Sequence, residues 1–177
     1  MKLISGNISY LPQYTDLLQK TYESAYVDDS LGLTKDCFSR EIFYNQATQS
    51  YLRSRLELTD HLQTWLAFDQ DKLIGSITVI LLSDTEAELT GFYVDPTFQG
   101  QGIGKKLYQL ALEFAGKRVL VLDIYLHNKK TIELYKKWGW QLDTSRGDNG
   151  YFYRHWPEWP AGLQAKAMYM RLVKKTR

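Results

Sequence analysis

A glycine-rich segment between a strand-like run and an amphipathic helical pattern constrains this sequence more than any other feature. Residues 89–94 are rich in branched and aromatic side chains, and residues 95–96 (Asp-Pro) are typical of a turn. Three glycines then alternate within residues 99–104, and a helical stripe begins at Ile103. Glycines let a ligand approach the backbone, and the N–H groups and dipole of a helix start favour negative charge. The segment therefore predicts an anion site, most simply for a phosphate-bearing ligand.

Two common phosphate motifs do not fit these residues. A dinucleotide fingerprint requires glycine where the chain has Lys105 or Leu107. A P-loop requires glycine in place of Gln99, and serine or threonine in place of Lys106. The spacing that does fit is Q-x-x-G-x-G, over residues 99–104. The alternative to an anion site is a tight turn that binds no ligand.

This spacing, after a Tyr-Val-Asp-Pro strand end, resembles the acetyl-CoA pyrophosphate loop of the GNAT superfamily of N-acetyltransferases. The resemblance implies that residues 99–105 hold the pyrophosphate of the cofactor. It also implies that the exposed edge of the fourth strand, at residues 92–94, pairs with the pantetheine amides and faces the oxyanion of the reaction. The alternative for residues 92–94 is an ordinary central strand.

The order of the predicted elements extends the resemblance beyond one motif. Strands are expected over residues 2–5, 64–69, 73–82, 86–94, 119–126, 140–144 and 166–173. Helices are expected over residues 11–26, over 36–58 in two pieces, from residue 103 to a stop at Gly116, and over 128–138. This is an α/β (α+β) pattern in the order of the GNAT fold. That fold has a central mixed, mostly antiparallel sheet of six to seven strands and about four helices, with the fourth and fifth strands splayed for acetyl-CoA.

We expect one domain over residues 1–177, because this length is sufficient for one substantial core. Within it, the resemblance implies a helical acceptor-side region at 1–60, a cofactor-binding core at 64–142, and a C-terminal loop and strand at 145–177.

Composition excludes several other classes of protein. The 22 basic and 20 acidic side chains nearly cancel, so net charge gives no support to nucleic-acid or membrane binding. The single cysteine, Cys37, rules out an intramolecular disulfide and supplies no metal cluster. Without an apolar run of membrane-span length or a signal-peptide core, a cytoplasmic location is expected. The sequence does not determine the oligomeric state, and a homodimer is one of the states compatible with it.

The helix expected over residues 128–138 contains a second group of candidate site residues. Asn128 and Tyr135 are seven residues apart, roughly two turns, and so lie on nearly the same face. The segment resembles the N-x-x-A-x-x-x-Y-x-x-x-G-F helix of the family, with Thr131 and Trp140 replacing the usual alanine and phenylalanine. The resemblance implies that Asn128 contacts the cofactor and that Tyr135 protonates the leaving thiolate. A helix N-cap and a core aromatic are the structural alternatives. An apolar stripe is expected at Thr131, Leu134, Tyr135 and Trp138.

Three carboxylates are candidates for the general base that takes a proton from the acceptor amine. Glu88, just before the fourth-strand edge, matches the catalytic glutamate of some family members and is preferred here. Glu86 is two residues before Glu88, so the two side chains lie on the same face of the strand. Asp123 on the fifth strand matches the position of the catalytic glutamate in family members that acetylate protein N-termini. Each is alternatively a solvated charge, and a chain of water molecules would serve without a single base.

Acceptor specificity is expected from the two regions that the resemblance covers least. These are the N-terminal helices, with Glu23, Tyr26, Asp28 and Asp29, and the connection 145–164, with Tyr151, Phe152, Tyr153, His155, Trp156 and Trp159. Aromatic walls with nearby carboxylates suit a cationic amine. The alternative is a surface loop whose aromatic side chains fill gaps in the core.

The sequence is therefore interpreted as an acetyltransferase that moves an acetyl group from acetyl-CoA to a primary amine of a small molecule, polyamine-like or other, or of a peptide. A non-catalytic acyl-CoA-binding sensor or interaction module on the same fold is the alternative. The residues expected to contact the cofactor are Phe92, Tyr93, Val94, Gln99, Gly100, Gln101, Gly102, Ile103, Gly104, Lys105, Asn128 and Tyr135. Glu88 and Tyr135 are the expected catalytic pair.

Overall fold

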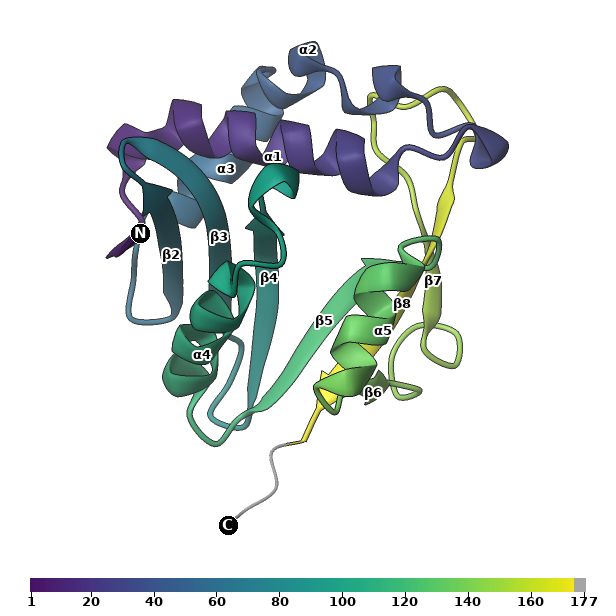
Figure 1. Cartoon of the computed structure of the whole chain (residues 1–177). Coiled ribbons are helices and arrows are strands. Elements are labelled where there is room, and N and C mark those ends of the chain that lie inside the picture. The colour runs from purple at the N-terminus through teal and green to yellow at the C-terminus, as the bar shows by residue number, and fades with distance from the viewer. Residues whose placement is uncertain (174–177) are drawn as a thin grey trace.

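The computed structural model describes residues 1–173 and contains one mixed sheet with helices on both faces (Figure 1). The strand order is β1-β2-β3-β4-β5-β8-β6, and β7 pairs with β8 beside this path. The strands are β1 (Lys2–Ser5), β2 (Leu62–Asp69), β3 (Lys72–Leu81), β4 (Glu86–Val94), β5 (Val119–Tyr125), β6 (Gln141–Leu142), β7 (Tyr151–Arg154) and β8 (Ala165–Leu172). The α-helices are α1 (Leu11–Tyr26), α2 (Arg40–Phe43), α3 (Gln46–Leu56), α4 (Ile103–Ala115) and α5 (Lys129–Lys137).

The predicted order of elements and the mostly antiparallel sheet are confirmed, but the counts differ. The sheet has eight strands rather than six to seven. The additional strand, β7, lies in the connection that was expected to be a loop and pairs antiparallel with the start of β8. Five α-helices are present where about four were expected, and the predicted division of the helical region 36–58 into two pieces is confirmed: it falls at Asn45, whose side chain caps α3 by accepting from the Thr48 amide.

Each face of the sheet carries its own buried cluster. Leu66 of β2 packs with α1 and α3, whereas the neighbouring Ala67 packs with α4, as expected for side chains that alternate across a strand. The helices α4 and α5 cover one face, and α1 and α3 cover the other. None of the helices among residues 1–173 is both long and apolar enough to span a membrane.

The buried face of α5 differs from the predicted stripe. Leu134 was assigned to that stripe but is 40% exposed, whereas Ile132 is only 6% exposed. Ile132 and Tyr135 are three residues apart and share the face that meets the core, so Leu134 is turned away from it.

The central feature of the sheet is the separation of β4 from β5. These strands are parallel and pair only over Glu86–Glu88 with Val119–Val121, after which they diverge (Figure 1). The predicted splay is therefore confirmed.

A β-bulge in β4 accompanies this divergence. Ser76 pairs with Tyr93 and Thr78 with Thr90, so β4 contains one more residue than β3 over this interval. Gly91 lies in the bulge with φ of +57°, a conformation in which an L side chain is strained.

We expect Gly91→Ala to lower the free energy of unfolding by about 1–2 kcal/mol from backbone strain alone. The new methyl group would also lie 3.0 Å from Thr78 Oγ1 and 3.2 Å from Tyr14 Oη. Gly162→Ala is the control, because Gly162 has φ of +81° but no atom within 4 Å of an added Cβ. Denaturant titrations should show the larger loss for Gly91→Ala, and equal losses would contradict a packing role for the bulge.

Candidate active site

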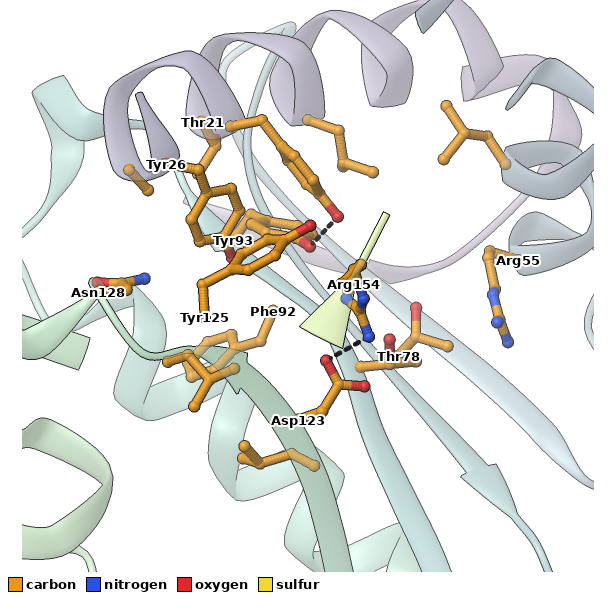
Figure 2. A pocket seen from close by; sticks show the side chains of 18 of the residues that line it. Thr21, Tyr26, Arg55, Thr78, Phe92, Tyr93, Asp123, Tyr125, Asn128 and Arg154 are labelled. Carbon is orange, nitrogen blue, oxygen red and sulfur yellow. Dashed lines mark hydrogen bonds and ion pairs between the residues drawn. The ribbon is translucent and has the colours of Figure 1, made fainter. Parts of the chain in front are cut away.

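A cleft of about 640 Å³ opens where β4 and β5 part. Side chains from α1 and α3 line it on one side, and those from β5, β7 and the start of α5 line it on the other (Figure 2). Among the predicted site residues, the cleft brings together Glu88, Phe92, Tyr93, Val94, Gln99, Asn128 and Tyr135.

The glycine-rich loop adjoins this cleft through Gln99, whose Nε2 donates to the Val94 carbonyl at 3.3 Å. Gly100 and Gly102 both have φ of +80°, which places their backbones in the left-handed region. No backbone N–H group from Gly100 to Lys105 donates a hydrogen bond within the described chain. Together with the dipole of α4, these groups form a site for an anion.

The other predicted loop residues have different environments. Gly104 is close to Phe92, so that an added Cβ would lie 3.4 Å from the ring. Ile103 is buried in the core below the helix start, and Gln101 and Lys105 are exposed.

The end of β4 has one paired and one unpaired edge. Tyr93 and Val94 pair with Ser76 and Gly75 of β3 on one side. On the other side β5 has already separated, so the backbone groups of residues 92–94 along that edge have no strand partner among residues 1–173. An extended ligand with amide groups can hydrogen-bond to such an edge.

Asn128 and Tyr135 both face the cleft from α5. Asn128 occupies the N-cap position, but its side chain makes no capping hydrogen bond, so its amide is available to a ligand. Tyr135 is 6% exposed and packs against Trp138 and Trp140, yet its hydroxyl makes no hydrogen bond with the described residues. Burial raises the pKa of Tyr135, so the phenol stays protonated at physiological pH.

The three candidate base carboxylates have different partners. Glu86 forms an ion pair with Arg146, outside the cleft. Asp123 is in the cleft, but its Oδ1 lies 2.7 Å from Nη2 of Arg154. Glu88 is in the cleft and forms no hydrogen bond or ion pair through its side chain with residues 1–173. Burial, and then the charge of Asp123, raise the pKa of Glu88, and the charges of Arg55, Arg146 and Arg154 offset part of this rise.

Aromatic side chains from α1, β4, β5 and the segment after β7 form one wall of the cleft. Tyr93 Oη donates to Tyr22 Oη at 2.8 Å, and Trp156 Nε1 donates to Tyr125 Oη at 3.0 Å. Burial raises the pKa of Tyr22, of Tyr93 and of the adjacent Tyr26, so this wall is neutral at physiological pH.

Only some of the residues proposed for acceptor specificity reach the cleft. Tyr26, His155 and Trp156 line it. Trp159 is instead buried in the core with its Nε1 donating to the Cys37 carbonyl, and Tyr153 is 62% exposed. The rest lie outside the cleft lining: Glu23, which pairs with Lys35, and Asp28, Asp29, Tyr151 and Phe152.

The sequence interpretation missed two arginines, Arg55 of α3 and Arg154 of β7, that line the cleft. No sequence signal marked them, because arginines in a polar helix or an irregular connection are usually solvent-exposed.

A third missed residue, Asp95, fixes the segment between β4 and the glycine-rich loop. Its side chain is 2% exposed and accepts hydrogen bonds from Lys20 Nζ at 2.8 Å and from the Thr97 amide at 2.9 Å. Lys72 Nζ lies 3.0 Å from its other oxygen. Burial alone would raise the pKa of Asp95, but the hydrogen bonds from Lys20, Thr97 and Lys72 outweigh burial and hold this pKa well below its usual range.

We expect Asp95→Asn to lower the free energy of unfolding by about 2 kcal/mol at pH 7, because charge-assisted hydrogen bonds are lost. Since the folded-state pKa is lowered, this contribution is present above the unfolded pKa and disappears as pH falls through the folded pKa. The difference between the two proteins should therefore shrink in strongly acidic denaturation experiments. Asp71→Asn, an exposed change near Lys72, is the control. A difference that persists unchanged at low pH would contradict this account.

Comparison with known proteins agrees with the geometry. The model of the acetyltransferase (GNAT) family matches residues 14–140, which is more than half of the chain. An uncharacterized N-acetyltransferase of Methanocaldococcus jannaschii is 41% identical over 58 residues, or 31% of this chain and 26% of that protein. The chain spans less than half the length of the curated relatives it matches.

Two solved structures have the same fold at low identity. The ribosomal-protein-S18-alanine N-acetyltransferase from Escherichia coli superposes with a TM-score of 0.68 at 18% identity, covering 99% of this chain and 96% of that one. The PaiA N-acetyltransferase from Thermoplasma acidophilum, solved with coenzyme A, gives a TM-score of 0.63 at 19% identity, covering 98% and 100%. The chain belongs to the GNAT family of acetyltransferases.

Proposed function

We propose that this protein transfers an acetyl group from acetyl-CoA to a primary amine of a small molecule or peptide by direct attack. The observation that carries the proposal is the convergence, at one cleft, of an anion-binding loop, an unpaired strand edge, an unpaired carboxylate and a buried phenol. These four features correspond to the four requirements of the reaction, which are a bound donor, an oxyanion contact, a base and an acid.

The donor is held along one continuous surface. The amides of the loop from Gly100 to Lys105 hold the pyrophosphate, and the free edge of residues 92–94 pairs with the pantetheine arm. Asn128 contacts the cofactor from the opposite side of the cleft. Support comes from the unpaired state of all three groups within the described chain.

The transfer then needs two proton movements. Glu88 accepts a proton from the amine, whose nitrogen forms a bond to the thioester carbon. Backbone N–H groups of the β4 edge stabilise the oxyanion, the carbon–sulfur bond breaks, and Tyr135 gives its proton to the thiolate. The products are an N-acetyl amide and CoA. Glu88 is favoured over Glu86 and Asp123 because those two carboxylates are held by arginines.

Release of the CoA thiol over a panel of amines tests the function, with Tyr135→Phe as the diagnostic variant. We expect turnover by the wild type and a fall of kcat by about 100-fold or more in the variant, because the acid is lost. Affinity for acetyl-CoA should change little, because the ring remains. Tyr153→Phe is the control, since Tyr153 is 62% exposed and outside the cleft.

An unchanged rate would remove Tyr135 from the mechanism. Tight acetyl-CoA binding by the wild type without turnover of any amine would contradict the enzyme and favour an acyl-CoA sensor.

The pH dependence of kcat/KM tests the base. Turnover should rise as pH passes the raised pKa of Glu88, because only the ionised carboxylate accepts a proton. Glu88→Gln should lose about 100-fold in rate together with this limb of the profile. Loss of the limb in Glu86→Gln or Asp123→Asn instead would assign the base to that residue.

The same variants separate catalysis from stability. A carboxyl whose pKa is raised by folding contributes less stability as pH rises through its unfolded and folded values. Glu88→Gln should therefore keep or raise the Tm above neutral pH. Glu86→Gln, which breaks the ion pair with Arg146, should lower it.

A further inference from the structure

The charges that face the acceptor side of the cleft do not all have partners. Asp123 and Arg154 are 2.7 Å apart and form one neutral pair near the centre of the cleft (Figure 2). The guanidinium of Arg154 also lies over the rings of Tyr125 and Phe152, at 5.4 and 5.3 Å from their centroids. The protein therefore holds Arg154 in place, and Asp123 neutralises its charge.

Arg55 is in a different state. It reaches into the cleft from the end of α3, on the side of Thr78 (Figure 2). Its guanidinium lies 4.6 Å from the centroid of the Tyr51 ring, and its Nη2 donates to Tyr51 Oη at 3.1 Å. Among residues 1–173 no carboxylate lies within ion-pair distance of it, and its buried Nε has no hydrogen-bond partner.

This leaves a cation with unused donors in a fixed position. A guanidinium has five N–H donors in a planar fork, which suits the two oxygens of a carboxylate or the oxygens of a phosphate. Stacking on Tyr51 orients that fork before a ligand arrives. Because no carboxylate of the described chain pairs with Arg55, an anionic ligand in the cleft gains a charge-assisted hydrogen bond from the guanidinium.

The cleft thus presents two groups of opposite charge, Arg55 and Glu88, that have no ion-pair partner among residues 1–173. A polyamine satisfies Glu88 but brings a second positive charge near Arg55, which is unfavourable. An amine that also carries an anionic group satisfies both. The aromatic wall of Tyr22, Tyr93 and Trp156 between α1 and the β7 side adds apolar contact without charge.

We propose that the acceptor is a zwitterionic amine of amino-acid type, whose ammonium group is directed to Glu88 and whose anionic group is bound by Arg55. This inference rests on the proposed acetyltransferase function and narrows its acceptor. It replaces the polyamine-like acceptor considered from the sequence with one of mixed charge.

The first test compares matched acceptors with the wild-type protein. Glycine, β-alanine, 4-aminobutyrate and 6-aminohexanoate are each assayed against an alkylamine and an α,ω-diamine of the same chain length. For at least one chain length we expect kcat/KM for the amino acid to exceed the values for the alkylamine and the diamine by about 10-fold or more. The reason is that the carboxylate of the amino acid gains a charge-assisted hydrogen bond. If alkylamines or diamines have a kcat/KM equal to that of the amino acid at every chain length, the zwitterionic acceptor is wrong, whereas the proposed acetyltransferase function still holds. Turnover of no amine of any class contradicts the proposed function itself.

The second test assigns the anion contact to Arg55. Arg55→Gln should raise KM for the preferred amino acid by about 10- to 100-fold. KM for acetyl-CoA should stay within about two-fold, and so should the kinetics with the alkylamine, which lacks a carboxylate, at a pH where Glu88 is ionised in both proteins, because neither substrate uses the guanidinium. Arg55→Lys should restore part of the loss by keeping the charge without the fork.

Arg53→Gln is the matched control, because Arg53 is exposed on the same helix and outside the cleft lining. Thermal unfolding of each variant shows whether α3 is intact. An equal loss of activity in Arg55→Gln for acceptors with and without a carboxylate would overturn the proposal and give Arg55 a structural role.

Discussion

The separation of β4 from β5 beyond Glu88 and Val121 is the constraint on which the rest of the structure depends. An open edge in the middle of a sheet loses ladder hydrogen bonds and must be stabilised by other contacts. On the α4–α5 face, the rings of Phe92, Tyr108 and Trp138 stack across the gap, with Tyr108 and Trp138 centroids 4.3 Å apart. Trp140 Nε1 also donates to Tyr108 Oη at 2.8 Å. The core is therefore continuous beneath the cleft although the sheet is not.

The two sides of the cleft are built differently along the chain, which explains what the sequence could predict. The side proposed to bind the donor comes from residues 92–105 and from the turn and helix at 128–135, where each proposed function depends on local spacing. Glycines at a helix start, and a pair seven residues apart on one helix, keep their relation in any fold that contains these elements. The side proposed to bind the acceptor combines α1, α3 and β7, which approach one another only after folding. No local sequence pattern therefore marked Arg55 and Arg154 as cleft residues. Tertiary contacts alone determine that Arg154 has a carboxylate partner and Arg55 has none among residues 1–173.

The same distinction accounts for the errors in the fold. β7 is short and has no alternating pattern of its own, and its pairing with β8 determines that Tyr151–Arg154 is a strand. The orientation of α5 is likewise set by the core that Ile132 and Tyr135 enter, which left Leu134 in solvent. Asp95 was interpreted as a turn residue, and its Thr97 contacts bear this out. Its ion pairs with Lys20 of α1 and Lys72 of β3 cross the fold and are not visible in a local pattern.

Several polar groups that have no partner among residues 1–173 lie at or beside the cleft. Buried polar groups in folded proteins usually have hydrogen-bond partners, so the exceptions are informative. Arg171 Nε is one such exception outside the cleft, and its guanidinium is 3.9 Å from Asp143. Arg55 Nε is the other exception among residues 1–173, and the cleft that Arg55 lines is also lined by Glu88 and the open edge of β4, with the glycine-rich loop beside it at Gln99. The fold holds Glu88, the guanidinium of Arg55 and the open edge of β4 in place at the cleft, so ligands that pair with them need little further reorganisation of the protein, and such preorganisation is what electrostatic catalysis requires.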